Sequence, residues 1–489
     1  MNYNKKAKRK ALCLNSAENL DSNYVNQVKW NVPKVLTLYI PENLDIDKIL
    51  SEKPPNFKHH RDCFIYLISL INDIPSRNKE LISEFTQFYS PLVQRRIKDY
   101  RLYLDYLIEN KIIETDNHYI KDTGKSKGYG YHLNYETKVK PIEITKYTLI
   151  KSILKFIDLD NTEIESENNG DSIINKELPY ITKWLNKNLT IDFEGASTYL
   201  LNEYKKDLKN KVKKRIANRK FCSRMIVIHK LHRGDFQYSI DNNAGRLYTV
   251  LTQIKKELRQ FIRYNGKNLV AIDIKNSQPY LSSILFSKFH FDLNNCENII
   301  KYYNPIFRND NNYTNFENKL VELGEKQDTK DFLEIISNGL IYEYFGCALQ
   351  NHSLIDLDLD PKIVRKKAKK ILISLLFSKN DYWHFQGYTN VLKTTFPSIF
   401  EAYYLLKYEK HNSLACFLQN LEAKLVLHKA CKIISEENPD LLILTIHDSI
   451  VTTEGNEEYV KGILSKVLHE NIGLPPTLEV EKWKKSLLS

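Results

Sequence analysis

The clearest pattern in the chain is an apolar run that ends near an acidic residue, and it occurs twice. Residues 268–274 are mostly apolar and include Asp273, and residues 441–453 hold two apolar segments separated by His447 and Asp448. Short apolar runs of this length are typical of buried strands. A carboxylate at the end of such a strand is costly unless a cation compensates it, and carboxylate oxygens are ligands for divalent cations. The pattern predicts two strands whose acids meet and hold two Mg²⁺ ions, as nucleotidyl transfer requires.

A basic segment between these two strands has a helical period. Arg365, Lys369, Ile373 and Phe377 recur every four residues, so they share one face of the predicted helix. The two cations can hold the β- and γ-phosphates of a triphosphate, while Ile373 and Phe377 offer an apolar surface to a base. An ordinary surface helix is the alternative interpretation of the same pattern.

The N-terminal part of the chain combines helical and strand patterns. Residues 92–108 form a basic amphipathic pattern, which is followed by a strand, a basic glycine turn at 124–128 and another strand. This order resembles a winged-helix module, which sets a helix in the major groove and a basic hairpin against phosphates. We expect residues 57–136 to form such a module; a helix–hairpin unit used only for protein packing is the alternative. The expected DNA contacts are Arg95, Arg96, Lys125 and Lys127.

Three further regions complete the predicted organisation. Residues 1–56 have weak patterning and are expected to be a partly ordered lead-in. Residues 137–235 form a helical connector with a strongly basic stretch at 195–233, which suits a nucleic-acid backbone. Residues 236–489 alternate strands with helical blocks, which predicts an α+β domain. The candidate nucleic-acid contacts in the basic stretch are Lys213, Lys214 and Arg215.

Composition narrows the class of protein. The 489 residues allow two to four domains, and a net charge of +12 favours a polyanionic partner over a neutral one. The seven cysteines are scattered, odd in number and without zinc-type spacing, which indicates a reducing, cytoplasmic location. No run of 18 apolar residues occurs, so no membrane contact is expected.

Five short segments in residues 240–489 resemble, in the same order, motifs of the family A polymerases, which include DNA polymerase I and the single-subunit phage RNA polymerases. The resemblance implies a right-hand α+β fold of thumb, palm and fingers with an antiparallel palm sheet. It implies palm and fingers in 236–489 and a thumb-like region within 137–235. The five segments are the Gly-Arg pair at Arg246, the strand of Asp273, the basic helix from Arg365, the helical segment with Gln419, and the His447–Asp448 pair.

The resemblance also implies catalytic roles. Asp273, the backbone carbonyl of Ile274, and Asp448 are the expected ligands of two Mg²⁺ ions. Arg365 and Lys369 are the expected triphosphate contacts, and His447 is expected near the primer terminus.

Binding roles follow from the same resemblance. Arg246 and Gln419 are expected to contact the primer–template. Gln278 stands at the sugar-selecting position, where the DNA polymerases have Glu and the phage RNA polymerases have Gly; a bulky side chain there favours deoxynucleotides. Ser449 stands where the DNA enzymes have Glu and the RNA enzymes have Ser. Ile373 replaces the usual aromatic residue of the fingers helix.

These observations predict a DNA-directed DNA polymerase that extends a primer on a DNA template with nucleoside triphosphates, as a monomer. Too little chain separates Asp192 and Glu194 from Asp273 for a 3′–5′ exonuclease domain, so no proofreading is expected. The small size and the fused module indicate a mobile element or a virus.

Three alternatives stay open at this point. They are a primer-independent RNA polymerase or primase-like enzyme on the same fold, a non-catalytic DNA-binding protein of replication or regulation, and an unrelated metal-dependent nuclease.

Overall fold

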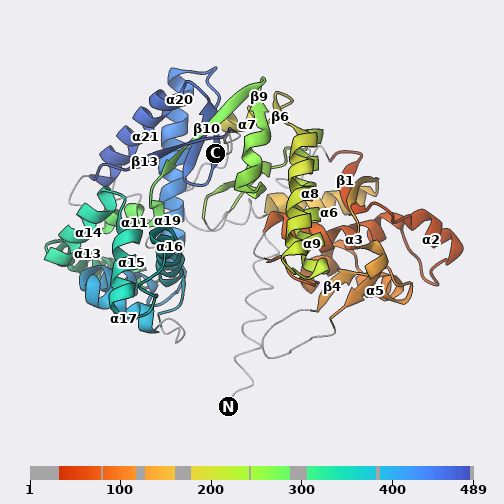
Figure 1. Cartoon of the computed structure of the whole chain (residues 1–489), viewed down its shortest axis with the longest axis horizontal. Helices are drawn as coiled ribbons and strands as arrows, with labels where there is room; N and C mark the ends of the chain where they lie inside the picture. The colour runs from red at the N-terminus through yellow and green to blue at the C-terminus, as the bar shows by residue number, and fades with distance from the viewer. Residues whose placement is uncertain are drawn as a thin grey trace, which may run out of the picture.

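The computed structural model describes residues 32–78, 81–116, 127–159, 178–241, 244–286, 305–380 and 386–484. Figure 1 shows an arch whose two sides meet at the top. The N-terminal elements, coloured red to yellow, form one side, and the C-terminal elements, coloured teal to blue, form the other. Within the described ranges, no helix combines the length and the apolar character needed to cross a bilayer.

The N-terminal side contains two small antiparallel sheets packed around one helix. Helix α3 is buried around most of its circumference, because its apolar run from Phe64 to Ile71 packs against both sheets and α5. Strand β1 pairs with β5, and β4 lies between β2 and β3. The elements are β1 (Leu36–Pro41), α2 (Ile46–Glu52), α3 (Arg61–Arg77), β2 (Thr86–Gln87), α4 (Ser90–Arg96), α5 (Tyr100–Glu109), β3 (Ile113–Thr115), β4 (Gly128–Tyr131), η2 (Leu133–Tyr135), β5 (Val139–Ile144) and α6 (Tyr147–Leu159).

The single helix predicted at 92–108 is wrong, because the structure divides it into α4 and α5. Ile97 has an extended backbone, and its N–H donates to the Val93 carbonyl to close α4. The side chains of Val93 and Ile97 are both buried, so the break between the helices lets both of them pack into the same core. The two strands predicted after this region are present as β3 and β4, with Glu114 opposite Gly130. Most of the basic turn between them, including Lys125, lies outside the described residues, and the winged-helix module stays a prediction.

A six-stranded antiparallel sheet lies at the centre of the chain. Its order is β11-β12-β10-β9-β6, and β13 also pairs with β10. The last residues of β10 are therefore hydrogen-bonded on both edges, to β12 and to β13. The strands are β6 (Leu189–Ile191), β9 (Ile262–Tyr264), β10 (Lys267–Ile274), β11 (Leu444–Ile446), β12 (Ser449–Thr453) and β13 (Leu478–Lys482). The strands predicted at 268–274 and within 441–453 are confirmed.

Helices carry most of the remaining C-terminal side and share one large hydrophobic core with the sheet. Their bounds are α11 (Ser277–Ser282), η4 (Ser283–Phe286), η5 (Pro305–Arg308), α13 (Asp310–Gly324), α14 (Gln327–Ser337), α15 (Ile341–Asn351), α16 (Pro361–Phe377), α17 (Gln386–Thr395), α18 (Pro397–Lys407), α19 (Ser413–Ala423), η7 (Lys424–Ala430), α20 (Cys431–Glu437) and α21 (Glu457–Ile472). The basic helix predicted from Arg365 is confirmed as part of α16, whose first turn is capped by Asp360. The described chain is thus a mixed fold of helices and strands, and its division into thumb, palm and fingers stays a prediction.

The basic stretch 195–233 is two helices rather than one. The connecting elements are α7 (Pro179–Thr182), α8 (Phe193–Lys209), α9 (Lys214–Arg233), β7 (Ser239–Ile240), β8 (Leu247–Tyr248), α10 (Val250–Gln253) and η3 (Lys256–Phe261). Asp192, half of the exonuclease-like pair, caps α8 by accepting from the Gly195 N–H. Lys211, with φ of 59°, lies in the turn between α8 and α9.

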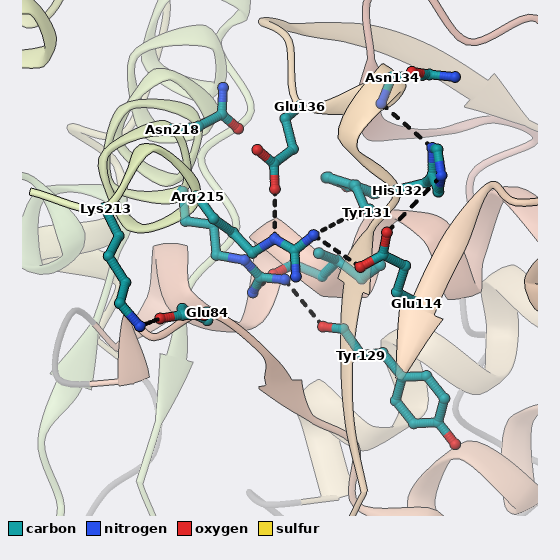
Figure 2. Close-up of polar contacts among 12 residues, drawn as sticks. Glu84, Glu114, Tyr129, Tyr131, His132, Asn134, Glu136, Lys213, Arg215 and Asn218 are labelled. Atoms are coloured by element: carbon teal, nitrogen blue, oxygen red, sulfur yellow. Dashed lines mark hydrogen bonds and ion pairs between the residues drawn. The ribbon is translucent and has the colours of Figure 1, made fainter. Parts of the chain in front are cut away.

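Helix α9 joins the two sides of the arch. Its apolar face shares one core with Tyr39 and Val139 of the N-terminal sheet and with Leu269 and Ala271 of β10. Near its start, Arg215 points into the N-terminal side (Figure 2) and Arg219 is buried there, while Lys213 and Lys214 are exposed. The N-terminal module and the central sheet are therefore parts of one continuous packing unit.

Arg219 is the most enclosed of these charged groups, at 2 % exposure. Its guanidinium donates to the Thr86 hydroxyl, to the Tyr129 carbonyl at 3.0 Å and to the Ile71 carbonyl at 3.4 Å. Burial lowers the pKa of Arg219 to about 10, and the three acceptors keep the cation hydrogen-bonded. One arginine of α9 thus ties together α3, β2 and β4.

We predict that Arg219→Leu lowers the free energy of unfolding by about 2–4 kcal/mol, because it removes the buried donor that α3, β2 and β4 share. Chemical denaturation measures the loss. The control is Lys214→Leu, five residues earlier on α9 at an exposed position, which should change stability by less than about 0.5 kcal/mol. Equal effects of the two substitutions would contradict the tie that Arg219 provides.

Candidate active site

The two acids singled out in the sequence come from neighbouring parts of the central sheet, Asp273 from β10 and Asp448 from the turn before β12. His447 and Asp448 form the two-residue turn of the β11–β12 hairpin, since Ile446 pairs with Ser449. Ser449 in turn pairs with Asp273 near the end of β10. Asp448 therefore directly precedes Ser449, the residue that pairs with Asp273 across the two strands.

The turn that presents Asp448 has an unusual backbone. His447 has φ of 53°, in the left-handed region that is uncommon for residues other than glycine, although histidine, asparagine and aspartate are enriched there. The Ser449 hydroxyl donates to the Ile446 carbonyl at 2.9 Å and braces the turn from inside. Backbone strain of this kind is often found at functional sites.

The charges of the two acids interact strongly. Burial and the nearby Asp448 carboxylate raise the pKa of Asp273 to about 7, and the Lys369 ammonium opposes that shift. Two more acids act in the same direction from β13, where Glu479 lies directly opposite Asp273 and Glu481 lies two residues further. The site therefore has an excess of negative charge that a bound cation would relieve.

The donor set at this point fits Mg²⁺. Asp273 and Asp448 offer hard carboxylate oxygens, and Mg²⁺ is commonly bound by one or two carboxylates together with substrate phosphates and water. Among the residues that the structure describes, no group of three or more His, Cys, Asp or Glu side chains is arranged as a metal site. Ile274, whose carbonyl is a further expected ligand, ends β10 opposite Leu478.

Helix α16 brings its cations to the same region. Arg365 and Lys369 both lie over the ring of Tyr342, at 5.5 Å and 5.7 Å from its centroid. Arg365 Nε also donates to Glu343 at 2.7 Å, so its guanidinium is held from two sides. Burial, together with the Asp448 carboxylate, raises the pKa of Tyr342.

The apolar half of the same helix face is partly covered. Ile373 and Phe377 are half-buried against the main core of the C-terminal side. Each leaves part of its side chain exposed, and a stacking surface for a base stays a prediction.

A buried polar network lies beside the acidic pair. Arg246 grips both oxygens of Glu422, with Nε to Oε1 at 2.9 Å and Nη2 to Oε2 at 2.7 Å. Gln278 Nε2 donates to Glu422 Oε2 at 2.8 Å, which fixes the orientation of its amide. Arg246, expected to contact the primer–template, is thus occupied by an internal ion pair, while Gln278 is buried at the start of α11.

Glu422 is the residue of this network that the sequence did not single out. Burial raises its pKa to about 7, and Arg246 and the Gln278 hydrogen bond act in the opposite direction. Asp448 also acts on Glu422, so the network lies within electrostatic reach of the acidic pair. Its place three residues after Gln419, on the mostly apolar helix α19, is the signal that could have identified it. Gln419 itself is half-buried on the same helix.

Tyr342 and Glu343 were also missed. They belong to the preceding helix, α15, and Glu343 is 22 residues from Arg365, so no motif spacing links them to Arg365 and Lys369. His447 lies edge-on to Tyr248 with ring centroids 5.8 Å apart, which joins the hairpin turn to the strand that follows Arg246.

The expected nucleic-acid contacts of the N-terminal half divide into two groups. Figure 2 shows Arg215 between Glu136 and Glu114, with Nε to Glu136 at 2.5 Å and Nη2 to Glu114 at 2.8 Å, and Lys213 bonded to Glu84. Arg96 packs against the Tyr66 ring at 5.5 Å. Exposed positions are occupied by Arg95, Lys127, Lys213 and Lys214.

Arg215 and Arg96 thus contribute to internal packing. A sequence that shows only their charge cannot distinguish this role from binding to an external phosphate.

Comparisons with known proteins give little further definition. No protein-family model matches the chain, and no curated protein matches it. Among solved structures, the polymerase domain of Pol1 from M. smegmatis, in a complex with a DNA primer-template and a dNTP, overlaps 83 % of this chain and 81 % of its own, with 10 % identity and a TM-score of 0.41. An overlap of that size carries no argument about activity, so the proposal below depends on the geometry of this chain alone.

The pKa of Asp273 predicts how stability depends on pH without metal. Between a pKa of about 3.9 in the unfolded chain and about 7 in the folded protein, only the folded state holds the proton. Stability then falls as pH rises through this window. Asp273→Asn should therefore stabilise the protein by about 1–2 kcal/mol at pH 8 and by almost nothing at pH 4.

Thermal denaturation in EDTA at both pH values measures this difference. The control is Asp440→Asn, at an exposed position before β11, which should have no pH-dependent effect. A stabilisation by Asp273→Asn that is the same at pH 4 and pH 8 would refute the interaction between the two acids.

Proposed function

We propose that this protein is a template-directed nucleotidyltransferase, and specifically a DNA-directed DNA polymerase that extends a primer without a 3′–5′ exonuclease. The observation that supports the proposal is the strand register that brings the turn of Asp448 next to Asp273 on β10, with Lys369 acting on Asp273 from the facing helix. Acids and a phosphate-binding cation in one place are what this chemistry requires.

Each residue has a role that follows from its surroundings. Asp273 and Asp448 would hold two Mg²⁺ ions, which when bound lower the pKa of an attacking hydroxyl and neutralise developing charge. Arg365 and Lys369 would hold the triphosphate, with Tyr342 fixing both cations over its ring. Positioning and charge neutralisation account for most of the catalysis in phosphoryl transfer, so the chain needs no further covalent chemistry.

A single-subunit RNA polymerase or primase-like enzyme is the second candidate. Ser449 supports it through the resemblance, while the buried, bulky Gln278 supports deoxynucleotides. The structure adds that the Ser449 hydroxyl is engaged inside the hairpin.

We predict that Asp273→Ala and Asp448→Ala each lower primer extension by about 10³-fold or more, because each removes a carboxylate needed to bind the metal ions. Binding of a primer–template should stay within about threefold of the native protein, because neither acid is expected to contact the strand directly. Gel-based extension with Mg²⁺ and fluorescence anisotropy measure the two effects. Extension that survives both substitutions would reject the polymerase proposal, and shortening of the primer would identify a nuclease.

The native protein separates the two polymerase candidates. We expect extension of a primed DNA template with dNTPs, and little product on an unprimed template or with rNTPs, because Gln278 crowds the sugar position. Product on an unprimed template with rNTPs would favour the RNA polymerase or primase-like enzyme. Absence of product in all four combinations would favour the non-catalytic DNA-binding protein.

A further inference from the structure

A buried lysine at the end of α18 has no role in the site described above. Lys407 is 7 % exposed, and within the described ranges it forms no ion pair with a carboxylate. Its Nζ donates instead to two backbone carbonyls, those of Leu375 at 2.7 Å and Ser378 at 3.1 Å. Both carbonyls belong to the C-terminal end of α16, the helix that carries Arg365 and Lys369. A side chain of one helix therefore closes the end of another.

The charge of α16 runs against its own helix dipole. Six of its first ten residues are cations, and its last seven residues, from Ile371 to Phe377, are uncharged. Cations are favourable near the C-terminus of a helix and unfavourable near its N-terminus, where the partial charge of the backbone is already positive. Lys407 supplies from α18 the cation that α16 lacks at its C-terminal end. The contact thus partly offsets the arrangement that places Arg365 and Lys369 in the first half of the helix.

A cation is costly in this position. Burial lowers the pKa of Lys407 to about 8, because its surroundings oppose the charged form. A methionine would fill a similar space without that cost, so packing alone does not account for the ammonium group. What the ammonium group adds is two hydrogen bonds to carbonyls at a helix end, where the helix backbone has no donors left for them.

The two accepting carbonyls bracket Phe377. Leu375 precedes it by two residues, and Ser378 follows it directly. A second contact holds the chain just beyond the helix, where Asn380 Nδ2 donates to the Tyr404 carbonyl of α18 at 3.1 Å. Helix α18 therefore fixes the backbone around Phe377, the last residue of the helix face that is expected to receive a nucleotide.

The rest of α16 is held independently of Lys407. Leu372, Leu375 and Leu376 are buried in the main core of the C-terminal side, and α15 packs along the helix. Loss of the contacts that Lys407 makes should therefore loosen the last turn of α16 without removing the helix.

We propose that Lys407 is a positioning residue for the incoming nucleotide. By fixing the backbone on both sides of Phe377, it sets the apolar surface on which the base packs, while Arg365 and Lys369 hold the triphosphate. This inference rests on the proposed function for the identity of the ligand. It adds that the affinity for the nucleotide depends on a side chain that does not touch the nucleotide.

The test replaces the ammonium group by Lys407→Met in the full-length protein. Extension of a primed DNA template is measured over a series of dNTP concentrations and, separately, of primer–template concentrations. We expect the KM for dNTP to rise about threefold to tenfold, which is part of what a base–aromatic stack contributes. The KM for primer–template should stay within about twofold of the native value, because the change is confined to the end of α16.

A double-mutant cycle distinguishes positioning from a general loss of structure. If Lys407 acts through Phe377, then in a Phe377→Ala background Lys407→Met should change the KM for dNTP by less than about twofold. Equal effects in the two backgrounds would overturn the route through Phe377.

Two controls address packing and stability. Lys393→Met removes a lysine that lies over the Phe400 ring of the same helix α18, and it should leave the KM for dNTP unchanged. Arg219→Leu lowers stability from the N-terminal side and should also leave this KM unchanged.

Asn380→Ala keeps the inference testable where Lys407→Met fails to fold. It removes only the second contact between α18 and the chain after α16, and it should raise the KM for dNTP by about twofold, as the loss of one modest hydrogen bond does. A native KM for dNTP in both Lys407→Met and Asn380→Ala would overturn the inference. A native protein that extends no primer would contradict the proposed function instead, before any variant is compared.

Discussion

The burial of Asp273 next to Asp448 is the constraint on which the arrangement of this site depends, because desolvation and like charge both disfavour its ionised form. Two carboxylates are held together at the end of a buried strand pair, and their like charge opposes folding unless a cation is present. The fold tolerates this because β10 is hydrogen-bonded on both edges and the surrounding core is extensive. The sheet thus maintains an unfavourable charge arrangement at a fixed place, which is how preorganised sites differ from ordinary surface acids.

The sequence predicted the elements whose signal is local. The strand of Asp273, the hairpin of Asp448 and the helix of Lys369 each have a pattern readable over ten to fifteen residues, and all three are present. The breaks at Ile97 and Lys211 were missed, because a one- or two-residue interruption hardly changes a helical period. Core contacts decide such positions, and they come from parts of the chain far away.

The partners of the charged residues could not be predicted for a related reason. Arg246 and Arg215 are basic residues whose counter-ions, Glu422 and Glu136, lie 176 and 79 residues away. A sequence shows that a side chain is charged but not whether it points into the protein or into solvent. An arginine in a buried ion pair and one that binds a phosphate therefore look the same in the sequence. Glu422 illustrates this ambiguity: it fixes both Arg246 and Gln278, although the sequence singled out its segment only for Gln419.

The continuity of packing through α9 has a consequence for how the protein can be divided. One helix supplies side chains to the core of β1 and β5 and to the core behind β10, and it also inserts Arg219 among the elements before it. Removing residues 32–144 would expose the apolar surface of α9 to water and would leave Arg219 without its present hydrogen-bond acceptors. We therefore do not expect residues 32–144 to be removable without unfolding the rest of the protein. A shortened version beginning at α8 would have to acquire a new surface before it could fold, so the two halves are bound to change together.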